Sequence, residues 1–445
     1  MLDNFFKFKE NGTDFKTEII AGITTFLAMA YILGVNPVIL ADGGMPAAGV
    51  LFATAVASGI ACIIMGLVAK YPVGLAPGMG LNALFTYTII LTMGNTWETA
   101  LAAVFISSII FLIITISGLR EAILNVIPLD LKLGIGAAIG FFLAFLGLKG
   151  AGIIVADPST FVTMGNLMAA PALLALIGIV ITLILYVREF PAAVFVGLVV
   201  TAIIGVIFTA LGFGAGDMLM PAVPAQFITT SFDLSLFGGF ARGFGQLFTN
   251  IPNLIMMLFS LVFVTFFDTT GTLMALGRQC GFIDEEGQAV GIENAFLADA
   301  VAGIIGAIFG TSTVTAYVES ATGIGLGGKT GLTAIVTGIL FLLSIFFTPL
   351  ILALFTSPVT CAALVIVGIL MIVQLKEVQW DSLVVAASVF MTIIMMILTY
   401  SISLGIAWGF VVYAIASLAS GKTKELSWGI WLMVIVFVIY LFFGL

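Results

Sequence analysis

Residues 261–276 read LVFVTFFDTTGTLMAL, and residues 310–323 read GTSTVTAYVESATG. Each stretch belongs to a run that is apolar enough to enter a bilayer, yet each carries a carboxylate, Asp268 in the first and Glu319 in the second. An acid at membrane depth costs roughly 2.5–3.5 kcal/mol on insertion scales, so a chain keeps one mostly where it faces a cavity, binds a solute or carries a proton. These two acids are therefore the first candidates for a transport site.

The composition around these stretches is that of an integral membrane protein. Of the 445 residues, 62% are hydrophobic and only 8% are charged, whereas soluble domains carry about 25% charged residues. Residues 1–18 are mixed polar and aromatic and lead directly into an apolar span, so we expect an uncleaved N-terminus. The chain has no histidine, so any proton coupling must use carboxylates. The scattered Cys62, Cys280 and Cys361 indicate neither a disulfide framework nor a metal site, and we expect no cofactor.

Apolar runs predict fourteen membrane spans, seven on each side of an irregular, Gly- and Pro-rich stretch at 213–251. The first set lies near 19–40, 47–69, 75–92, 99–117, 131–148, 171–187 and 191–212. The second set lies near 253–276, 294–309, 311–327, 331–354, 359–375, 382–399 and 402–419. A last apolar run at 428–444 is either a surface or capping helix or a fifteenth span.

The basic residues test this topology. With the N-terminus placed inside, all but two of the 14 Lys and Arg residues fall on the inner side, as the positive-inside rule demands. The two outer ones are Lys149 and Arg242. We therefore expect a multi-pass protein of the plasma membrane, of the bacterial inner-membrane type, with a cytoplasmic N-terminus. The inner set is Lys7, Lys9, Lys16, Lys70, Arg120, Lys132, Arg188, Arg278, Lys329, Lys376, Lys422 and Lys424.

The two halves of the chain resemble weak copies of each other. Residues 191–204 (PAAVFVGLVVTAII) and 404–416 (LGIAWGFVVYAIA) share a Gly before a Val-Val-x-Ala-Ile core, and each closes its set of seven spans. An odd number of spans per copy inverts the second copy in the membrane, which is typical of transporters with a site at the repeat interface. The third and tenth spans hold equivalent positions, and their Gly, Pro and β-branched residues disfavour a continuous helix. We predict that each is part extended and part helical, and that this pair marks the binding site.

Each candidate residue also has a structural interpretation. Asp268 could be bonded to neighbouring Thr hydroxyls, and Glu319 could cap the half-helix that follows it. Asn82, the polar residue of the third span, could cap a helix after a break. Thr272 is more ordinary as a packing or local hydrogen-bonding residue, and Asp299 is a weaker candidate among the intramembrane acids.

The chemistry of these groups narrows the range of solutes that the site could bind. Half-helices that begin at mid-membrane favour an anion at their N-terminal ends, whereas two carboxylates oppose one. The balance favours a neutral solute rich in N–H groups, such as an oxo- or aminopurine, with backbone N–H groups of the broken spans donating to its acceptors. Phe267 and Tyr317 are candidates for stacking on a flat ring. A carboxyl group that takes up a proton when buried would also couple transport to H+.

Four motifs carry a resemblance to a known family. They are residues 17–37 (TEIIAGITTFLAMAYILGVNP), 76–83 (APGMGLNA), 266–272 (FFDTTGT) and 316–323 (AYVESATG). Over nearly its whole length the chain resembles the nucleobase–cation symporters of the nucleobase–ascorbate superfamily, in the azaguanine-resistance-type branch of hypoxanthine, guanine and adenine permeases. The resemblance implies an all-α polytopic fold of fourteen spans in two inverted seven-span repeats.

The resemblance also implies a core domain and a gate domain. The core would hold spans 1–4 and 8–11, within residues 1–118 and 252–355. The gate would hold spans 5–7 and 12–14, within residues 119–251 and 356–420, and an apolar C-terminal helix would follow at 421–445. The family suggests a homodimer that forms through the gate domain.

Carried over residue by residue, the resemblance implies roles for the motif positions. Asp268 and Glu319 match the substrate-binding acids of the eighth and tenth spans. Asn82, followed by Ala83, matches the polar site residue of the third span. Two positions just before the second acid are expected to supply ring contacts and a backbone donor; they are Tyr317 and Val318.

The uracil branch of the same superfamily differs at two of these positions. It has Glu where this chain has Asp268, and His where this chain has Thr272. The shorter acid leaves room for a second ring, which fits a purine. Without the His, the proton would be carried by Asp268 or Glu319.

The sequence thus predicts a secondary active transporter, and not an enzyme, that imports purine bases (hypoxanthine, guanine or adenine) with H+, in preference to Na+, by alternating access. An anion transporter of the same fold is one alternative, but it predicts a basic or neutral residue at position 319. An uncoupled nucleobase channel is another, and it predicts uptake that an uncoupler leaves unchanged. A membrane-embedded enzyme would need metal ligands or a nucleophile–base pair at mid-membrane, and the sequence offers neither. Nothing in the sequence indicates a nucleic-acid partner.

Overall fold

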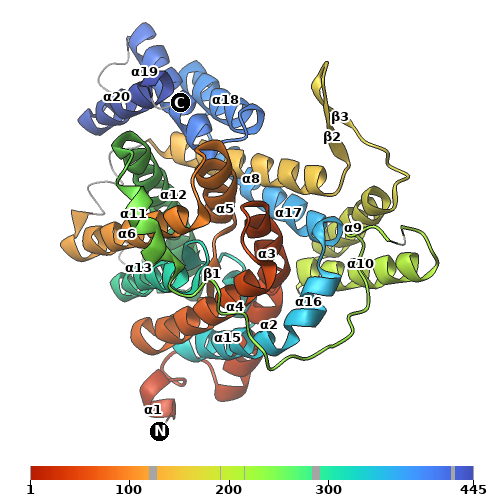
Figure 1. The fold of residues 1–445 in the computed structure, drawn as a ribbon. Coiled ribbons are helices and arrows are strands. Elements are labelled where there is room, and N and C mark those ends of the chain that lie inside the picture. Colours follow the sequence, from red (N-terminus) through yellow and green to blue (C-terminus); the bar gives the residue numbers. More distant parts are fainter. Residues whose placement is uncertain are drawn as a thin grey trace.

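The computed structural model describes residues 2–119, 128–190, 192–214, 216–282, 291–421 and 426–443, and these form a mostly helical polytopic fold (Figure 1). Three basic residues that the predicted topology places inside lie outside the described residues: Arg120, Lys422 and Lys424. The chain opens with a short helix, α1 (Leu2–Phe6), before the first predicted span.

Eleven helical segments of the described residues are long and apolar enough to cross a membrane. They coincide with the predicted spans except the third, the tenth and the thirteenth. In the first half they are built from α2 (Phe15–Met29) with α3 (Ile32–Asp42), α4 (Ala47–Ile64) with η1 (Met65–Ala69), α6 (Trp97–Ser117), α8 (Leu129–Gly150), α9 (Ala170–Val187) and α10 (Ala193–Ala210).

The second half holds the remaining five segments. Its segments are α12 (Ile251–Cys280), α13 (Ile292–Phe309), α15 (Gly331–Ser344) with η3 (Ile345–Phe347) and α16 (Thr348–Leu354), α17 (Ser357–Ile372) with η4 (Val373–Glu377), and α19 (Ile402–Ala419). The predicted thirteenth span is a shorter apolar helix, α18 (Leu383–Leu398). The run predicted at 428–444 is α20 (Trp428–Phe443), which packs on α19. The fourteen-span count therefore stays a prediction.

The third and tenth spans are part extended and part helical, as the sequence predicted. The third consists of β1 (Leu75–Pro77), α5 (Met79–Ala83) and the wider helix η2 (Leu84–Thr92). The tenth consists of β4 (Val314–Ala316) and α14 (Ser320–Gly325). The two strands pair antiparallel, with Leu75 opposite Ala316 and Pro77 opposite Val314. Their ladder supplies the hydrogen bonds that a broken helix loses, which is what allows extended backbone to lie inside the protein at this depth.

The helices pack in two groups. One group joins α2, α4, α6, α12, α13 and α15, and the other joins α8, α9, α10, α17, α18 and α19. Contacts between the groups run through α3, α5 and η2, and α2 also contacts α10 directly. In Figure 1, α9 and α10 lie together at the right of the molecule, beside the end of α17. The strand pair β1–β4 belongs to the first group and reaches the boundary with the second.

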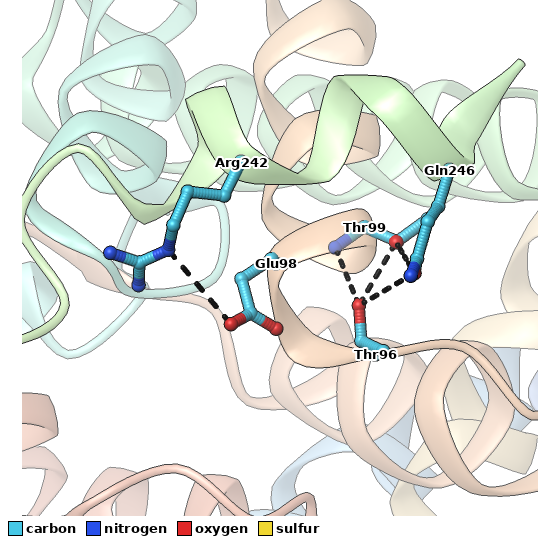
Figure 2. Close-up of polar contacts among 5 residues, drawn as sticks. All are labelled: Thr96, Glu98, Thr99, Arg242 and Gln246. Carbon is cyan, nitrogen blue, oxygen red and sulfur yellow. Dashed lines mark hydrogen bonds and ion pairs between the residues drawn. The ribbon is translucent and has the colours of Figure 1, made fainter.

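The stretch 213–251 contains a helix that the sequence did not predict, α11 (Gly239–Leu247). It packs on α6, where the hydroxyls of Thr96 and Thr99 lie against Gln246 (Figure 2). In the same view Arg242 reaches Glu98, with 4.0 Å between Nε and Oε1. Helix propensity did not predict α11 because it is rich in glycine. Two of these glycines, Gly239 and Gly243, allow its backbone to approach α6 closely.

A hairpin of β2 (Ile154–Asp157) and β3 (Phe161–Met164) joins α8 to α9 and projects from the helices at the upper right of Figure 1. The outer faces of the helices carry exposed apolar side chains, such as Ile113 on α6, Val187 on α9 and Phe390 on α18. An apolar exterior around a chain with few charges is the arrangement expected where the surrounding medium is lipid.

Candidate functional site

A cavity of about 1380 Å³ lies where the β1–β4 crossing meets α8, α12 and α17. Its inner end is lined by Gly78–Leu81, which follow β1, and by Ala316–Glu319, which begin at the last residue of β4. The opposite wall comes from α8 and α17. The two breaks in the helical spans therefore open onto one space, as the equivalent positions of the third and tenth spans predicted.

Glu319 is half-buried and lines this cavity. Its Oε1 accepts a hydrogen bond of 2.6 Å from the hydroxyl of Tyr31, which comes from the joint between α2 and α3. Glu319 occupies the N-cap position of α14, but its side chain makes no capping hydrogen bond. The structural interpretation of this acid as a helix cap is therefore wrong.

Asp268, the other candidate acid, also lines the cavity and is half-buried. The neighbouring hydroxyls are directed elsewhere: Thr269 donates to Asp299 at 2.7 Å, and Thr270 donates to the carbonyl of Phe266. Gly78 keeps the wall open beside this acid, because a Cβ there would lie 3.6 Å from Asp268 Oδ2 and 2.8 Å from a methyl carbon of Thr315.

Four further predicted residues line the same cavity: Phe267, Thr272, Tyr317 and Val318. The hydroxyl of Tyr317 donates to the carbonyl of Pro77 at 2.5 Å, which ties the tenth span to the third. Lys132 of α8 lies over the ring of Phe267, with Nζ 5.4 Å from the centroid. The cavity thus combines these two acids with aromatic surface, and Lys132 belongs to its lining.

Asn82 and Ala83 lie behind the cavity wall. Both are fully buried in the third span, and neither lines the cavity. Asn82 Oδ1 accepts a hydrogen bond from the hydroxyl of Ser312, just before β4. In this conformation Asn82 supports the crossing of the two broken spans instead of facing the space between them.

Asp299 has a larger part in this architecture than the sequence suggested. It is 1% exposed, and its Oδ1 accepts from the backbone N–H of Ala316 at 2.7 Å and from the hydroxyl of Thr315 at 3.1 Å. Its other oxygen accepts from Thr269. One carboxylate of α13 therefore holds β4 against α12.

One contributor to the site was missed by sequence reasoning. It is Tyr31, whose hydroxyl is directed at Glu319; the only sequence signal is a phenol within an otherwise apolar span. The backbone donors expected from the broken spans correspond to the first turn of α5, Met79–Leu81, which lines the cavity. N–H groups in the first turn of a helix have no partner within the helix, so they are available to a solute. In the described residues no cluster of three or more acids or cysteines could hold a metal ion.

The cavity extends from the crossing toward one end of the helices. Its mouth includes Lys132 near the start of α8, Arg278 near the end of α12 and Glu377 at the end of η4. In the predicted topology these are inner ends of spans. On the other side of the crossing, rings of Tyr87, Phe142 and Tyr400 contact one another edge to face.

This arrangement of broken spans, paired strands and an intramembrane cavity defines a class, the polytopic transporters in which two broken spans meet at the site. The transmembrane domain of a cyanobacterial bicarbonate transporter, BicA, has the same fold, with a TM-score of 0.62 over 87% of this chain and 97% of that one at 16% identity. The model of a permease family matches residues 16–408. The chain therefore belongs to this family, the nucleobase–ascorbate transporters.

Curated relatives cover nearly the full length of the chain. The guanine/hypoxanthine permease PbuG of Bacillus subtilis is 46% identical over 99% of this chain and 100% of its own. The adenine permease AdeP of Escherichia coli is 38% identical over 100% of this chain and 96% of its own. The putative permease MJ0326 of Methanocaldococcus jannaschii is 44% identical over 98% and 97%.

Proposed function

We propose that this protein is a secondary active permease that imports purine nucleobases, namely hypoxanthine, guanine or adenine, together with protons by alternating access. The observation that carries the proposal is that Asp268 and Glu319 line one intramembrane cavity. Among the described residues neither acid belongs to a salt bridge. Acids held at this depth without a paired cation are suited to accept N–H groups of a solute and to take up a proton.

The shape and chemistry of the cavity support a flat, neutral ring as the solute. Phe267 and Tyr317 offer aromatic faces or edges, the two acids accept N–H donors, and the first turn of α5 offers donors to ring nitrogens and carbonyls. The names of the curated relatives, which are guanine/hypoxanthine and adenine permeases, support the same class of solute.

The two packing groups support alternating access between a core and a gate domain. The core would hold residues 1–118 and 252–355, and the gate residues 119–251 and 356–420. In the described conformation the cavity reaches Arg278 and Glu377, which are inner ends if the N-terminus is cytoplasmic. This is the geometry of an inward-open state, with the outer side closed by the rings around Tyr400. Purine import is coupled to protons if Asp268 or Glu319 releases its proton to the inner side from this state.

The fold alone does not separate this proposal from an anion transporter, because the bicarbonate transporter shares it. The decisive residue is Glu319, since a carboxylate at the site opposes a bound anion. An uncoupled channel would need an open route to the outer side, and the ring cluster at Tyr400 opposes one in this conformation.

Competition uptake tests the proposal. Radiolabelled hypoxanthine is given to cells that lack their own purine permeases, with guanine, adenine, uracil and bicarbonate as competitors, with and without a protonophore. Competition by purines and loss of accumulation with the protonophore are expected. Competition by bicarbonate in place of purines would support the anion transporter, and purine uptake that the protonophore leaves unchanged would support the channel.

A further inference from the structure

Tyr31 lies at the point where the first span changes direction. Helix α2 ends at Met29, Ala30 follows it, and Tyr31 is the residue before α3. Its side chain is only 1% exposed, yet it reaches the cavity wall. A phenol in this position is surrounded by protein on all sides except the one that faces the solute site.

The contacts of Tyr31 fix the direction in which Glu319 faces. The tyrosine hydroxyl carries one proton, and it donates that proton to Glu319 Oε1 at 2.6 Å. The ring of Tyr31 lies 6.4 Å from that of Tyr317, whose own hydroxyl is held by the Pro77 carbonyl. Because both rings are held, the carboxylate cannot turn away without losing the bond from Tyr31. Oε1 therefore already accepts one hydrogen bond and keeps one lone pair for a further donor, so Oε2 is the less encumbered oxygen for a solute.

Purines differ in how many adjacent N–H groups they present to a carboxylate. The six-membered ring of hypoxanthine has one N–H beside its carbonyl, which one carboxylate oxygen satisfies. Guanine has the same N–H with an amino group next to it, and the two together match both oxygens of a carboxylate. A second donor on Oε1 would have to compete with the hydroxyl of Tyr31 for the space and lone pairs of that oxygen.

We propose that Tyr31 is a specificity-determining residue, which by engaging Oε1 of Glu319 favours bases with a single ring N–H, such as hypoxanthine, over bases with two adjacent donors, such as guanine. The inference rests on the proposed function, since it concerns the same solute and the same acid. Tyr31 acts through Glu319 and need not touch the solute itself.

The test compares Tyr31→Phe with the wild-type protein in competition uptake. The substitution removes the hydroxyl and keeps the ring, so Oε1 of Glu319 loses its competing donor. The ratio of guanine to hypoxanthine affinity is expected to rise about tenfold, as expected for a hydrogen bond to a charged group. A ratio that stays at the wild-type value would overturn the inference.

Tyr87→Phe is the matched control. The hydroxyl of Tyr87 also donates to a carboxylate, Asp42 Oδ2 at 2.7 Å, but Tyr87 does not line the cavity. This variant is expected to keep the wild-type ratio of the two bases. An equal shift in both variants would count against a role for Tyr31 in specificity and indicate a general effect of losing a buried hydroxyl.

Two further outcomes keep the inference separate from the proposed function. A wild-type protein that takes up no purine overturns both. If Tyr31→Phe takes up too little solute to measure, the thermal shift of the purified variant in guanine and in hypoxanthine gives the same affinity ratio. An unchanged ratio in that measurement overturns the inference while the proposed function stands on the wild-type uptake.

Discussion

The rings of Tyr87 and Tyr400 meet edge to face, with centroids 5.2 Å apart and planes at 80°. Tyr87 belongs to the third span, and Tyr400 lies between α18 and α19, so the contact joins the two packing groups. Phe142 of α8 completes the cluster, 5.4 Å from Tyr400. Polar bonds hold both tyrosines: Tyr87 donates to Asp42, and Lys149 Nζ donates to the hydroxyl of Tyr400 at 3.1 Å. In the predicted topology this cluster lies toward the outer side, where the proposed alternating access requires the cavity to be closed.

Removal of the ring at position 400 is expected to open that side. Edge-to-face pairs contribute about 0.5–1.5 kcal/mol each beyond their buried area, so Tyr400→Ala should favour the outward-open state several-fold. The readout is a cysteine at Thr272, which lines the cavity, labelled in intact cells by a maleimide that cannot cross the membrane. Labelling should rise in the Tyr400→Ala background.

Tyr400→Phe is the control for this experiment, because it keeps the ring contacts and loses only the bond from Lys149. Its labelling should lie close to that of the parent. The three native cysteines are buried and free, so they give a low background. Equal labelling of the Tyr400→Ala variant and the parent would show that the ring cluster does not close the site.

Asp299 is expected to be a stability determinant of the crossing. Replacement by Ala leaves the N–H of Ala316 and the hydroxyls of Thr315 and Thr269 without their acceptor. Leaving several buried donors unsatisfied costs about 3 kcal/mol or more, so we expect a melting temperature in detergent lower by several degrees.

Asp299→Asn separates loss of acceptors from loss of charge. The amide oxygen can still accept from Ala316, and the Thr269 hydroxyl can rotate to accept from the amide nitrogen. This variant should therefore lose less stability than Asp299→Ala. If both variants melt at the wild-type temperature, the carboxylate does not hold β4 in place.

Periodicity and charge predicted the order of the spans, because a long apolar run has few alternatives in a bilayer. The two broken spans were also predictable, since Pro77 and the Gly and Thr residues around β4 disfavour a helix over that length. Their pairing was not, because sequence does not say which residues of β1 lie opposite which residues of β4.

The candidate site was predicted only in part, because sequence does not show which residues of distant spans lie opposite one another. Asp268 and Glu319 are conspicuous as acids in apolar runs, whatever their neighbours. Tyr31 and Asp299 depend on contacts between spans far apart in the chain, and a phenol in an apolar run is ordinary by itself. Asn82 looked like a site residue because it is polar, but its partner, Ser312, lies behind the cavity wall. The polarity of a buried side chain predicts that it has a hydrogen-bond partner, but it does not identify that partner.

Helix α11 offers a paired test of close packing on α6 (Figure 2). A Cβ at Gly243 would lie 2.0 Å from the carbonyl oxygen of Glu98, which is backbone and cannot move aside. Gly243→Ala should therefore separate α11 from α6 and cost about 2 kcal/mol. The melting temperature of the purified protein is the measurement.

Gly245→Ala is the matched control on the same helix, because a Cβ there meets nothing within 4 Å. It should leave the melting temperature unchanged or raise it slightly, since Ala favours a helix over Gly by about 1 kcal/mol. An equal loss of stability in both variants would mean that the clash with Glu98 is not the cause of the loss.

Replacement of Glu319 by Gln is expected to abolish uphill accumulation of purines. Gln keeps the size of the side chain and can still accept the bond from Tyr31, but it cannot exchange a proton. Solute can then move down its gradient without coupling. The measurement is the steady-state ratio of internal to external hypoxanthine, which should fall to about one, while exchange of labelled for unlabelled base continues.

Glu293→Gln provides the comparison, because Glu293 lines the same cavity near its mouth and is exposed. The same change of charge there should leave an accumulation ratio that still collapses with a protonophore. If Glu319→Gln accumulates hypoxanthine as the wild type does, the proton is carried elsewhere. Asp268→Asn would then be the variant to lose accumulation, since Asp268 is the other half-buried acid in the wall of the cavity. Accumulation that survives in both single variants and in the double variant would mean that neither acid carries the proton.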